Sequence, residues 1–158
     1  FVPPIALIAM AASISISAAD TWASEVGMAF RGRTVDISSW KPVPRGLSGG
    51  ISLAGTLGAV AASLIFALIG ILLIDTGQDR SLLFFLIACA GISGMLIDSL
   101  LGSFLQPRFR SQEGILLDMR LPGSKQISGR SWMTNDAVNI ISNFFVTGLI
   151  VLLLDLFG

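Results

Sequence analysis

The chain has 158 residues, of which 53% are hydrophobic and only 13% are charged, and its ten Lys and Arg residues balance its ten Asp and Glu residues. A mean hydropathy of +0.82 is typical of an integral membrane protein. The zero net charge offers no basic surface for nucleic acid, and the absence of His excludes His-based catalytic triads and His metal sites. A single cysteine, Cys89, can form neither an internal disulfide nor a thiolate metal cage.

Four segments are apolar and long enough to cross a bilayer as helices, which takes about 20 residues. These predicted spans are 2–19, 51–74, 82–105 and 137–157. The first contains the alternating stretch "SISIS", but an isolated strand would leave its backbone groups unpaired in lipid, so we expect a helix. Residues 1–19 contain no basic residue, so we do not interpret them as a signal peptide. The sequence therefore predicts an all-α, polytopic helix bundle forming a single membrane domain.

The connections between these spans are unequal, with two long ones at 20–50 and 106–136 and a short one between them. Nine of the ten basic residues lie in the long connections: Arg31, Arg33, Lys41, Arg45, Arg108, Arg110, Arg120, Lys125 and Arg130. The positive-inside rule places both long connections on the cytoplasmic side, or on its stromal or matrix equivalent. With antiparallel spans, every unusual polar cluster of the chain then falls at one membrane face.

The third span carries a polar stripe near its end. Asp98, Gly102 and Gln106 are four residues apart and share one helical face. A carboxylate inside an apolar span costs about 2.5–3.5 kcal/mol on insertion scales and needs a partner. No basic residue lies on any span, so we interpret Asp98 as facing a cation, a proton or a polar pocket. Alternatively, Asp98 and Ser99 hydrogen-bond a neighbouring helix and the glycines only allow close packing.

The fourth span begins with a second polar stripe. Thr134 or Asn135 is suited to cap the helix. Asn135, Asp136 and Asn139 offer amide and carboxylate oxygens, the ligands that Mg²⁺ takes while keeping waters or substrate phosphate oxygens. Capping and hydrogen bonds between helices are the alternative, which we prefer for Asn143.

A glycine-rich stretch, "GLSGGISLAG", precedes the second span. Backbone N–H groups and a helix N-terminus suit a phosphate, although no Walker A sequence is present. Lys41, with Arg45 close behind it, could neutralise a phosphate, and topology signalling is the alternative for both cations.

Four motifs, in order, resemble the phytyl-phosphate kinase family of polytopic membrane proteins, which includes a plant vitamin E pathway enzyme and the transmembrane protein 19 group. They are "AADTWASEVG", "ISSWKPVPRGLSGGISLAGTLGA", "GMLIDSLLGSFLQ" and "ISGRSWMTNDAVNIIS". The resemblance implies a kinase that extends an isoprenoid monophosphate lipid to the diphosphate, with CTP as donor and Mg²⁺ as cofactor. It also implies further helices before Phe1 and a plastid, endoplasmic reticulum or prokaryotic inner membrane.

The resulting hypothesis is direct phosphoryl transfer, which depends on positioning and charge neutralisation. Asp98, Asp20 and Lys41 are the candidate catalytic residues. The candidate metal ligands are Asp20, Glu25, Asp98, Asn135 and Asp136, and the candidate nucleotide- and substrate-binding residues are Gly49, Gly50, Ser52, Ser99, Gln106 and Asn139.

Two other classes stay open at this point. An ion-coupled transporter would also place a carboxylate and glycine-broken helices in the membrane. A non-catalytic subunit of a larger membrane complex would keep the same bundle without turnover. As partners of the chain we expect the bilayer and either further copies of itself, in a homo-oligomer, or a membrane complex.

Overall fold

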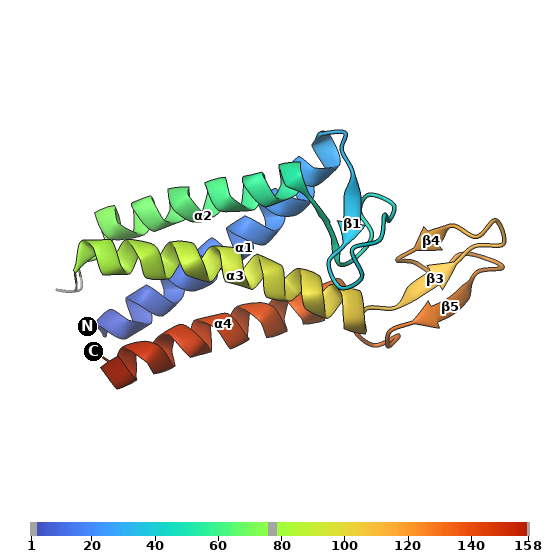
Figure 1. The fold of residues 1–158 in the computed structure, drawn as a ribbon. Helices are drawn as coiled ribbons and strands as arrows, with labels where there is room; N and C mark the ends of the chain where they lie inside the picture. The colour runs from blue at the N-terminus through green and yellow to red at the C-terminus, as the bar shows by residue number, and fades with distance from the viewer. Residues whose placement is uncertain (1–2, 76–78, 158) are drawn as a thin grey trace.

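The computed structural model describes residues 3–75 and 79–157 (Figure 1). Its framework is four long helices: α1 (Pro4–Ala29), α2 (Leu53–Leu73), α3 (Arg80–Leu105) and α4 (Asn135–Phe157). Each of the four is long and apolar enough to cross a membrane. The predicted four-helix membrane bundle is therefore confirmed. The predicted first span begins at residue 2 and the short connection includes 76–78, and these positions lie outside the described residues.

The helices run antiparallel in chain order, so both long connections lie at one end of the bundle, which we call the loop end (Figure 1). The start of α1, the end of α2, the start of α3 and the end of α4 lie at the other end (Figure 1). Helix α1 packs against all three other helices. The expectation that distant polar motifs share one membrane face agrees with this arrangement.

Small residues form much of the contact between helices. Ala12, Ala59, Ala62 and Ala67 are fully buried. A side-chain carbon on Gly94 would lie 2.5 Å from Ile16, which shows how closely α3 approaches α1. Because lipid tails are as apolar as leucine, such close packing is what holds helices together in a membrane.

Helix α1 runs on to Ala29, beyond the predicted span 2–19, so Asp20 and Glu25 lie on its last turns and not in the following loop. At a rise of 1.5 Å per residue, α1 and α3 are each about 39 Å long, whereas the hydrocarbon core is about 30 Å thick. Both helices therefore project into the interfacial region.

The long connections contain short strands that the sequence analysis did not predict. Strand β1 (Thr34–Asp36) pairs antiparallel with β2 (Gly50–Ser52), which leads directly into α2. Strand β3 (Arg108–Arg110) is the middle of a second antiparallel sheet, between β4 (Leu116–Leu117) and β5 (Lys125–Ser128). Strands of two to four residues are too short to show a reliable alternation of apolar and polar positions.

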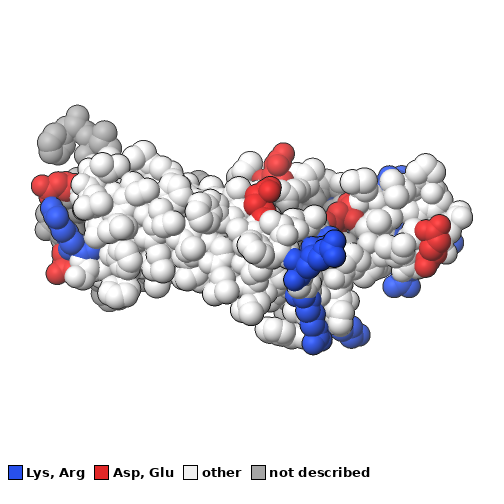
Figure 2. Space-filling model, turned by 90° about the horizontal axis from the view of Figure 1, so that it is seen from above, with Lys and Arg blue, Asp and Glu red and all other residues white. Residues whose placement is uncertain are grey.

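On the face drawn in Figure 2, charged side chains lie at one end and over the loop half of the molecule, and the helical surface between them carries no charge. Helix α2 contains no Asp, Glu, Lys or Arg, and α4 contains only Asp136 and Asp155, near its two ends. This distribution matches an apolar layer between two aqueous phases.

Replacing Gly58 with Ala tests the close packing of α2 on α1. The added carbon would lie 2.9 Å from the Trp22 carbonyl oxygen and from Val26 Cβ. We expect this crowding to lower the free energy of unfolding by about 1–3 kcal/mol, as measured by unfolding in detergent. Gly148→Ala in α4 is the matched control, because nothing lies within 4 Å of its added carbon. Equal stability of the two variants would contradict the packing.

Candidate active site

A polar cavity of about 320 Å³ lies at the loop end, between the last turns of α1, the start of α2 and the second half of α3. The glycine-rich turn at 45–50 forms one wall and Asn135 of α4 contributes to the rim. It combines carboxylates, amides and backbone groups from parts of the chain that are far apart in sequence.

Eight of the predicted site residues line this cavity: Asp20, Gly49, Gly50, Ser52, Asp98, Ser99, Gln106 and Asn135. Asn139 lies behind the wall, where it contacts Asp98. Lys41, Glu25 and Asp136 are exposed and are not among the lining residues. Arg45 lines the cavity on the side where a phosphate-neutralising cation was expected.

Asp98 is buried on α3, and only one of its two carboxylate oxygens is hydrogen-bonded within the described chain. Ser142 Oγ donates to Asp98 Oδ2 at 3.1 Å. With the Asn139 amide oriented as its surroundings require, its nitrogen donates to the same Oδ2 at 2.7 Å. Within the described chain no Lys or Arg forms an ion pair with Asp98. Asp20 lines the same cavity, and its negative charge repels that of Asp98. Asp98 Oδ1 is therefore left for a cationic partner.

Two amide side chains complete this side of the cavity. Gln106 is only 5% exposed and donates from Nε2 to Asn135 Oδ1 at 3.4 Å. Thr134 is the helix cap, since its hydroxyl accepts from the Ala137 N–H at 3.2 Å. Asn135 therefore does not cap the helix. The Gln106 side-chain oxygen forms no hydrogen bond with the described residues.

Glycine is required in the turn that forms the opposite wall. Gly46 and Gly49 have φ values of 81° and 77°, in the left-handed region that favours glycine. A side-chain carbon on Gly49 would also lie 2.6 Å from Ser103 Cα. The turn can therefore bring its backbone against α3 and expose backbone groups to the cavity.

Ser52 has a structural task that the sequence analysis did not assign to it. Its hydroxyl accepts from the Gly55 N–H at 3.1 Å and so caps α2. The Ser52 hydroxyl is therefore used as the helix cap. The first residues of α2 still line the cavity, and the partial positive charge of a helix N-terminus favours an anion there.

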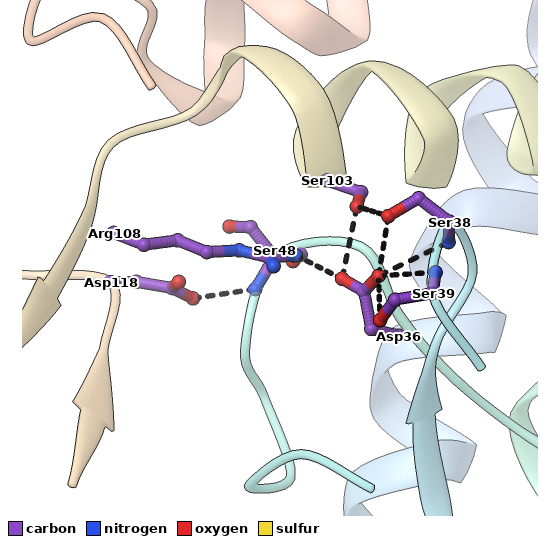
Figure 3. Close-up of polar contacts among 7 residues, drawn as sticks. All are labelled: Asp36, Ser38, Ser39, Ser48, Ser103, Arg108 and Asp118. Carbon is purple, nitrogen blue, oxygen red and sulfur yellow. Dashed lines mark hydrogen bonds and ion pairs between the residues drawn. The ribbon is translucent and has the colours of Figure 1, made fainter. Parts of the chain in front are cut away.

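A polar network beside the turn was missed at the sequence level (Figure 3). Asp36, whose side chain is 1% exposed, forms an ion pair with Arg108 and accepts from Ser103 Oγ at 2.9 Å. Arg108 also donates to the Ser48 carbonyl at 2.7 Å, while the Ser48 N–H donates to Asp118 Oδ2 at 2.8 Å. Asp followed by serines signals a local turn, but Asp36 and Arg108 are 72 residues apart and no local pattern links them.

The network shifts the acidity of its two carboxyl groups in opposite directions. Burial disfavours the charge of Asp36, but hydrogen bonds from Ser38, Arg108, Ser103 and Ser39 outweigh it and hold its pKa well below the usual range. Burial raises the pKa of Asp118, against the hydrogen bond from Ser48 and the charge of Arg108.

Fold and cavity together define a polytopic integral membrane protein with a polar site at one face. The chain belongs to the family described as "Integral membrane protein DUF92", which matches residues 2–147. This range contains all four motifs on which the resemblance rests, so the predicted family membership is confirmed.

Several curated proteins are similar to the chain. Protein PGR of Arabidopsis thaliana is 36% identical over 132 residues, covering 78% of this chain and 46% of the relative. An uncharacterized membrane protein of Synechocystis sp. is 35% identical over 133 residues (84% and 42%). Protein VTE6, chloroplastic, of Arabidopsis thaliana is 28% identical over 145 residues (92% and 37%). The chain spans less than half the length of these relatives, and no solved structure matches it.

The Asp36→Asn variant tests the buried ion pair. A carboxyl group whose folded pKa is lowered stabilises the fold fully above its unfolded pKa of 3.8 and loses this contribution progressively as the pH falls from there through the folded pKa. We expect the variant to be less stable than wild type by about 3 kcal/mol at pH 7, and this difference to begin to shrink below about pH 4.5 and to go on shrinking down to at least about pH 3. Thermal unfolding in detergent across this range measures it. A difference independent of pH would contradict the ionised pair.

Proposed function

We propose that the protein containing this chain is a membrane-embedded isoprenoid phosphate kinase, which transfers a phosphoryl group from CTP to an isoprenoid monophosphate. One observation carries the proposal: Asp20 and Asp98 face a glycine-rich turn and a helix N-terminus across one cavity. Carboxylates that can hold a cation thus lie opposite groups that can hold a phosphate. The motif resemblance and the distant similarity to VTE6 support the same activity.

The donor set in the cavity suits Mg²⁺. The described residues contain no cluster of three Asp, Glu, Cys or His side chains that could hold a metal by themselves. Mg²⁺ is commonly bound by one or two carboxylates together with substrate phosphates and waters, and Asp20 with Asp98 Oδ1 supplies that number. Gln106 adds an amide oxygen, whereas Glu25 and Asp136 are outside the lining and are not part of the proposed site. Bound there, Mg²⁺ would neutralise charge that develops on the transferring phosphoryl group.

The opposite wall would bind the phosphates of the nucleotide. Gly49 and Gly50 expose backbone to the cavity, and the α2 N-terminus adds a favourable field for an anion. Arg45 takes the neutralising role that the sequence analysis gave to Lys41, because Arg45 lines the cavity and Lys41 does not. Arg45 Nη1 lies 3.4 Å from the Met28 carbonyl of α1, which places it at the rim.

The chemistry is an in-line displacement between two phosphates. A phosphate oxygen of the isoprenoid monophosphate bonds to the γ-phosphorus of CTP, the bond from that phosphorus to the β–γ bridging oxygen breaks, and CDP leaves with the electron pair. The attacking oxygen is already an anion, so no general base is needed, in agreement with a site without His. The residues of the cavity need only orient the two phosphates and balance their charge.

Carboxylate-to-amide substitutions test the proposal in the full-length protein in lipid nanodiscs, assayed with labelled CTP, Mg²⁺ and phytyl or geranylgeranyl phosphate. We expect Asp98→Asn and Asp20→Asn each to lower diphosphate formation by about 100-fold or more, because each removes charge that balances the transferring phosphoryl group. Asp155→Asn is the matched control, since Asp155 is exposed at the far end of α4.

Two outcomes would contradict different parts of this proposal. If Asp98→Asn and wild type form diphosphate equally well, the site is wrong. If wild type forms none with any nucleoside triphosphate, the kinase activity itself is wrong, and a non-catalytic subunit or an ion-coupled transporter takes its place. A raised Mg²⁺ requirement in Asp20→Asn, measured by titration, would separate a metal-binding role from a role in folding.

A further inference from the structure

We propose that Arg108 is a positioning residue that orients the Ser48–Gly49 peptide so that the Gly49 N–H points into the polar cavity and binds a phosphate oxygen. The inference rests on the proposed function, in which this cavity holds phosphate. It adds a specific donor, the Gly49 amide, and a side chain outside the cavity lining that determines where this donor points.

The orientation follows from the geometry of a peptide bond. Arg108 Nη2 holds the Ser48 carbonyl oxygen at 2.7 Å, on the side of the turn that faces β3 (Figure 3). In a planar trans peptide the N–H points opposite to the carbonyl, and the N–H in the same plane as the Ser48 carbonyl is that of Gly49. The Gly49 amide is therefore directed away from Arg108, and Gly49 is one of the residues that line the cavity.

This amide has no partner among the described residues, although its neighbours in the turn do. The Leu47 and Gly50 N–H groups donate to backbone carbonyls within the turn, and the Ser48 N–H donates to Asp118. No hydrogen bond from the Gly49 N–H is formed within the described chain, while the Gly49 carbonyl accepts from the Ile37 N–H at 2.9 Å. A backbone donor in a half-buried turn needs an acceptor, and a ligand oxygen would supply it.

There is room for that oxygen because residue 102 is glycine. The place that a side-chain carbon of Gly102 would occupy lies 3.2 Å from the Gly49 nitrogen. This is within hydrogen-bonding distance, and Gly102 itself lines the cavity. Any side chain at 102 would fill the position of the proposed phosphate oxygen.

Arg108 can hold the peptide firmly because it is itself fixed. The same guanidinium nitrogen reaches the Asp36 carboxylate, which Ser103 Oγ and the Ser38 hydroxyl also hold. Arg108 is 13% exposed, so little water competes for these bonds. The Lys side chain is shorter, so its ammonium would end short of the position of Arg108 Nη2 and could not reach both the Asp36 carboxylate and the Ser48 carbonyl from the same backbone.

The experiment follows the Gly49 amide directly by NMR in the full-length protein in nanodiscs. Labelling serine carbonyls with ¹³C and glycine nitrogens with ¹⁵N selects Ser–Gly peptides, of which this chain has three: Ser48–Gly49, Ser93–Gly94 and Ser128–Gly129. The Ser48→Ala variant identifies the Gly49 signal by its loss. We expect inorganic pyrophosphate with Mg²⁺ to move the Gly49 amide proton downfield and to leave the Gly94 signal, from the middle of α3, unchanged.

Arg108→Lys is the test variant and Arg110→Gln the control, because Arg110 lies on the same strand and is exposed. We expect Arg108→Lys to weaken pyrophosphate binding by about tenfold, the equivalent of one charge-assisted hydrogen bond, and to abolish the Gly49 shift. In the kinase assay the KM for CTP should rise. Arg110→Gln should match wild type, and an unchanged Gly94 signal in Arg108→Lys verifies that the bundle is folded.

The outcomes separate this inference from the proposed function. If pyrophosphate binds to wild type without moving the Gly49 signal, or if Arg108→Lys retains the shift, the inference is wrong and the kinase proposal stands. If Gly49 responds but no diphosphate is formed from CTP, the inference holds and the kinase proposal fails. If wild type binds no pyrophosphate, the inference is wrong, and diphosphate formation from CTP decides the kinase proposal separately.

Discussion

The ion pair between Asp36 and Arg108 joins the two long connections of the chain at the loop end. Arg108 begins β3, three residues after the end of α3, and Asp36 ends β1, which pairs with β2 just before α2. Removing one partner would leave the other charge buried and unpaired, which commonly lowers the free energy of unfolding by about 3–5 kcal/mol. The glycine-rich turn lies between Asp36 and Arg108 in the chain. Both backbone groups of Ser48 are hydrogen-bonded, the carbonyl to Arg108 and the N–H to Asp118. The shape of one cavity wall therefore depends on contacts that lie outside the cavity.

The membrane imposes a different constraint on the other wall. In the bundle, polar side chains have to find partners on neighbouring helices, and Asp98 does so through Ser142 and Asn139 of α4. Asn143 of α4 likewise bonds Ser13 and Ser17 of α1. These bonds hold α4 against α1 and α3 and present one carboxylate oxygen to the cavity. Packing and site geometry thus use the same side chains on α4.

Much of this arrangement could be predicted from the sequence. Hydropathy gave four spans, and the asymmetry of Lys and Arg brought the polar motifs to one face. Asp98, Gly102 and Gln106 were recognised because helical spacing is regular. The role of Asn143 in bonding another helix was also predicted, and the structure confirms it. These predictions succeeded because each depends on a local period or on composition.

The failures have a common physical origin. Lys41 was expected in the site with Arg45 as a second cation, but only Arg45 lines the cavity, because a loop sequence does not determine which side chain points inward. Ser52 was assigned to phosphate, but capping a helix uses the same hydroxyl. Asp36 and Arg108 were not connected, since a contact across 72 residues is formed by tertiary structure alone. The short strands that bring them together carry too few residues to be recognised.

The overhang of α1 and α3 beyond the apolar layer has a kinetic consequence for an enzyme of the proposed kind. Where this overhang lies at the loop end, the cavity would open near the lipid headgroups, between the aqueous phase and the bilayer. An acceptor anchored by its isoprenoid chain would reach the site by diffusing in two dimensions, while the nucleotide arrives from bulk water. The rate would then follow the mole fraction of acceptor in the membrane, so that adding inert lipid would slow the reaction at constant total substrate.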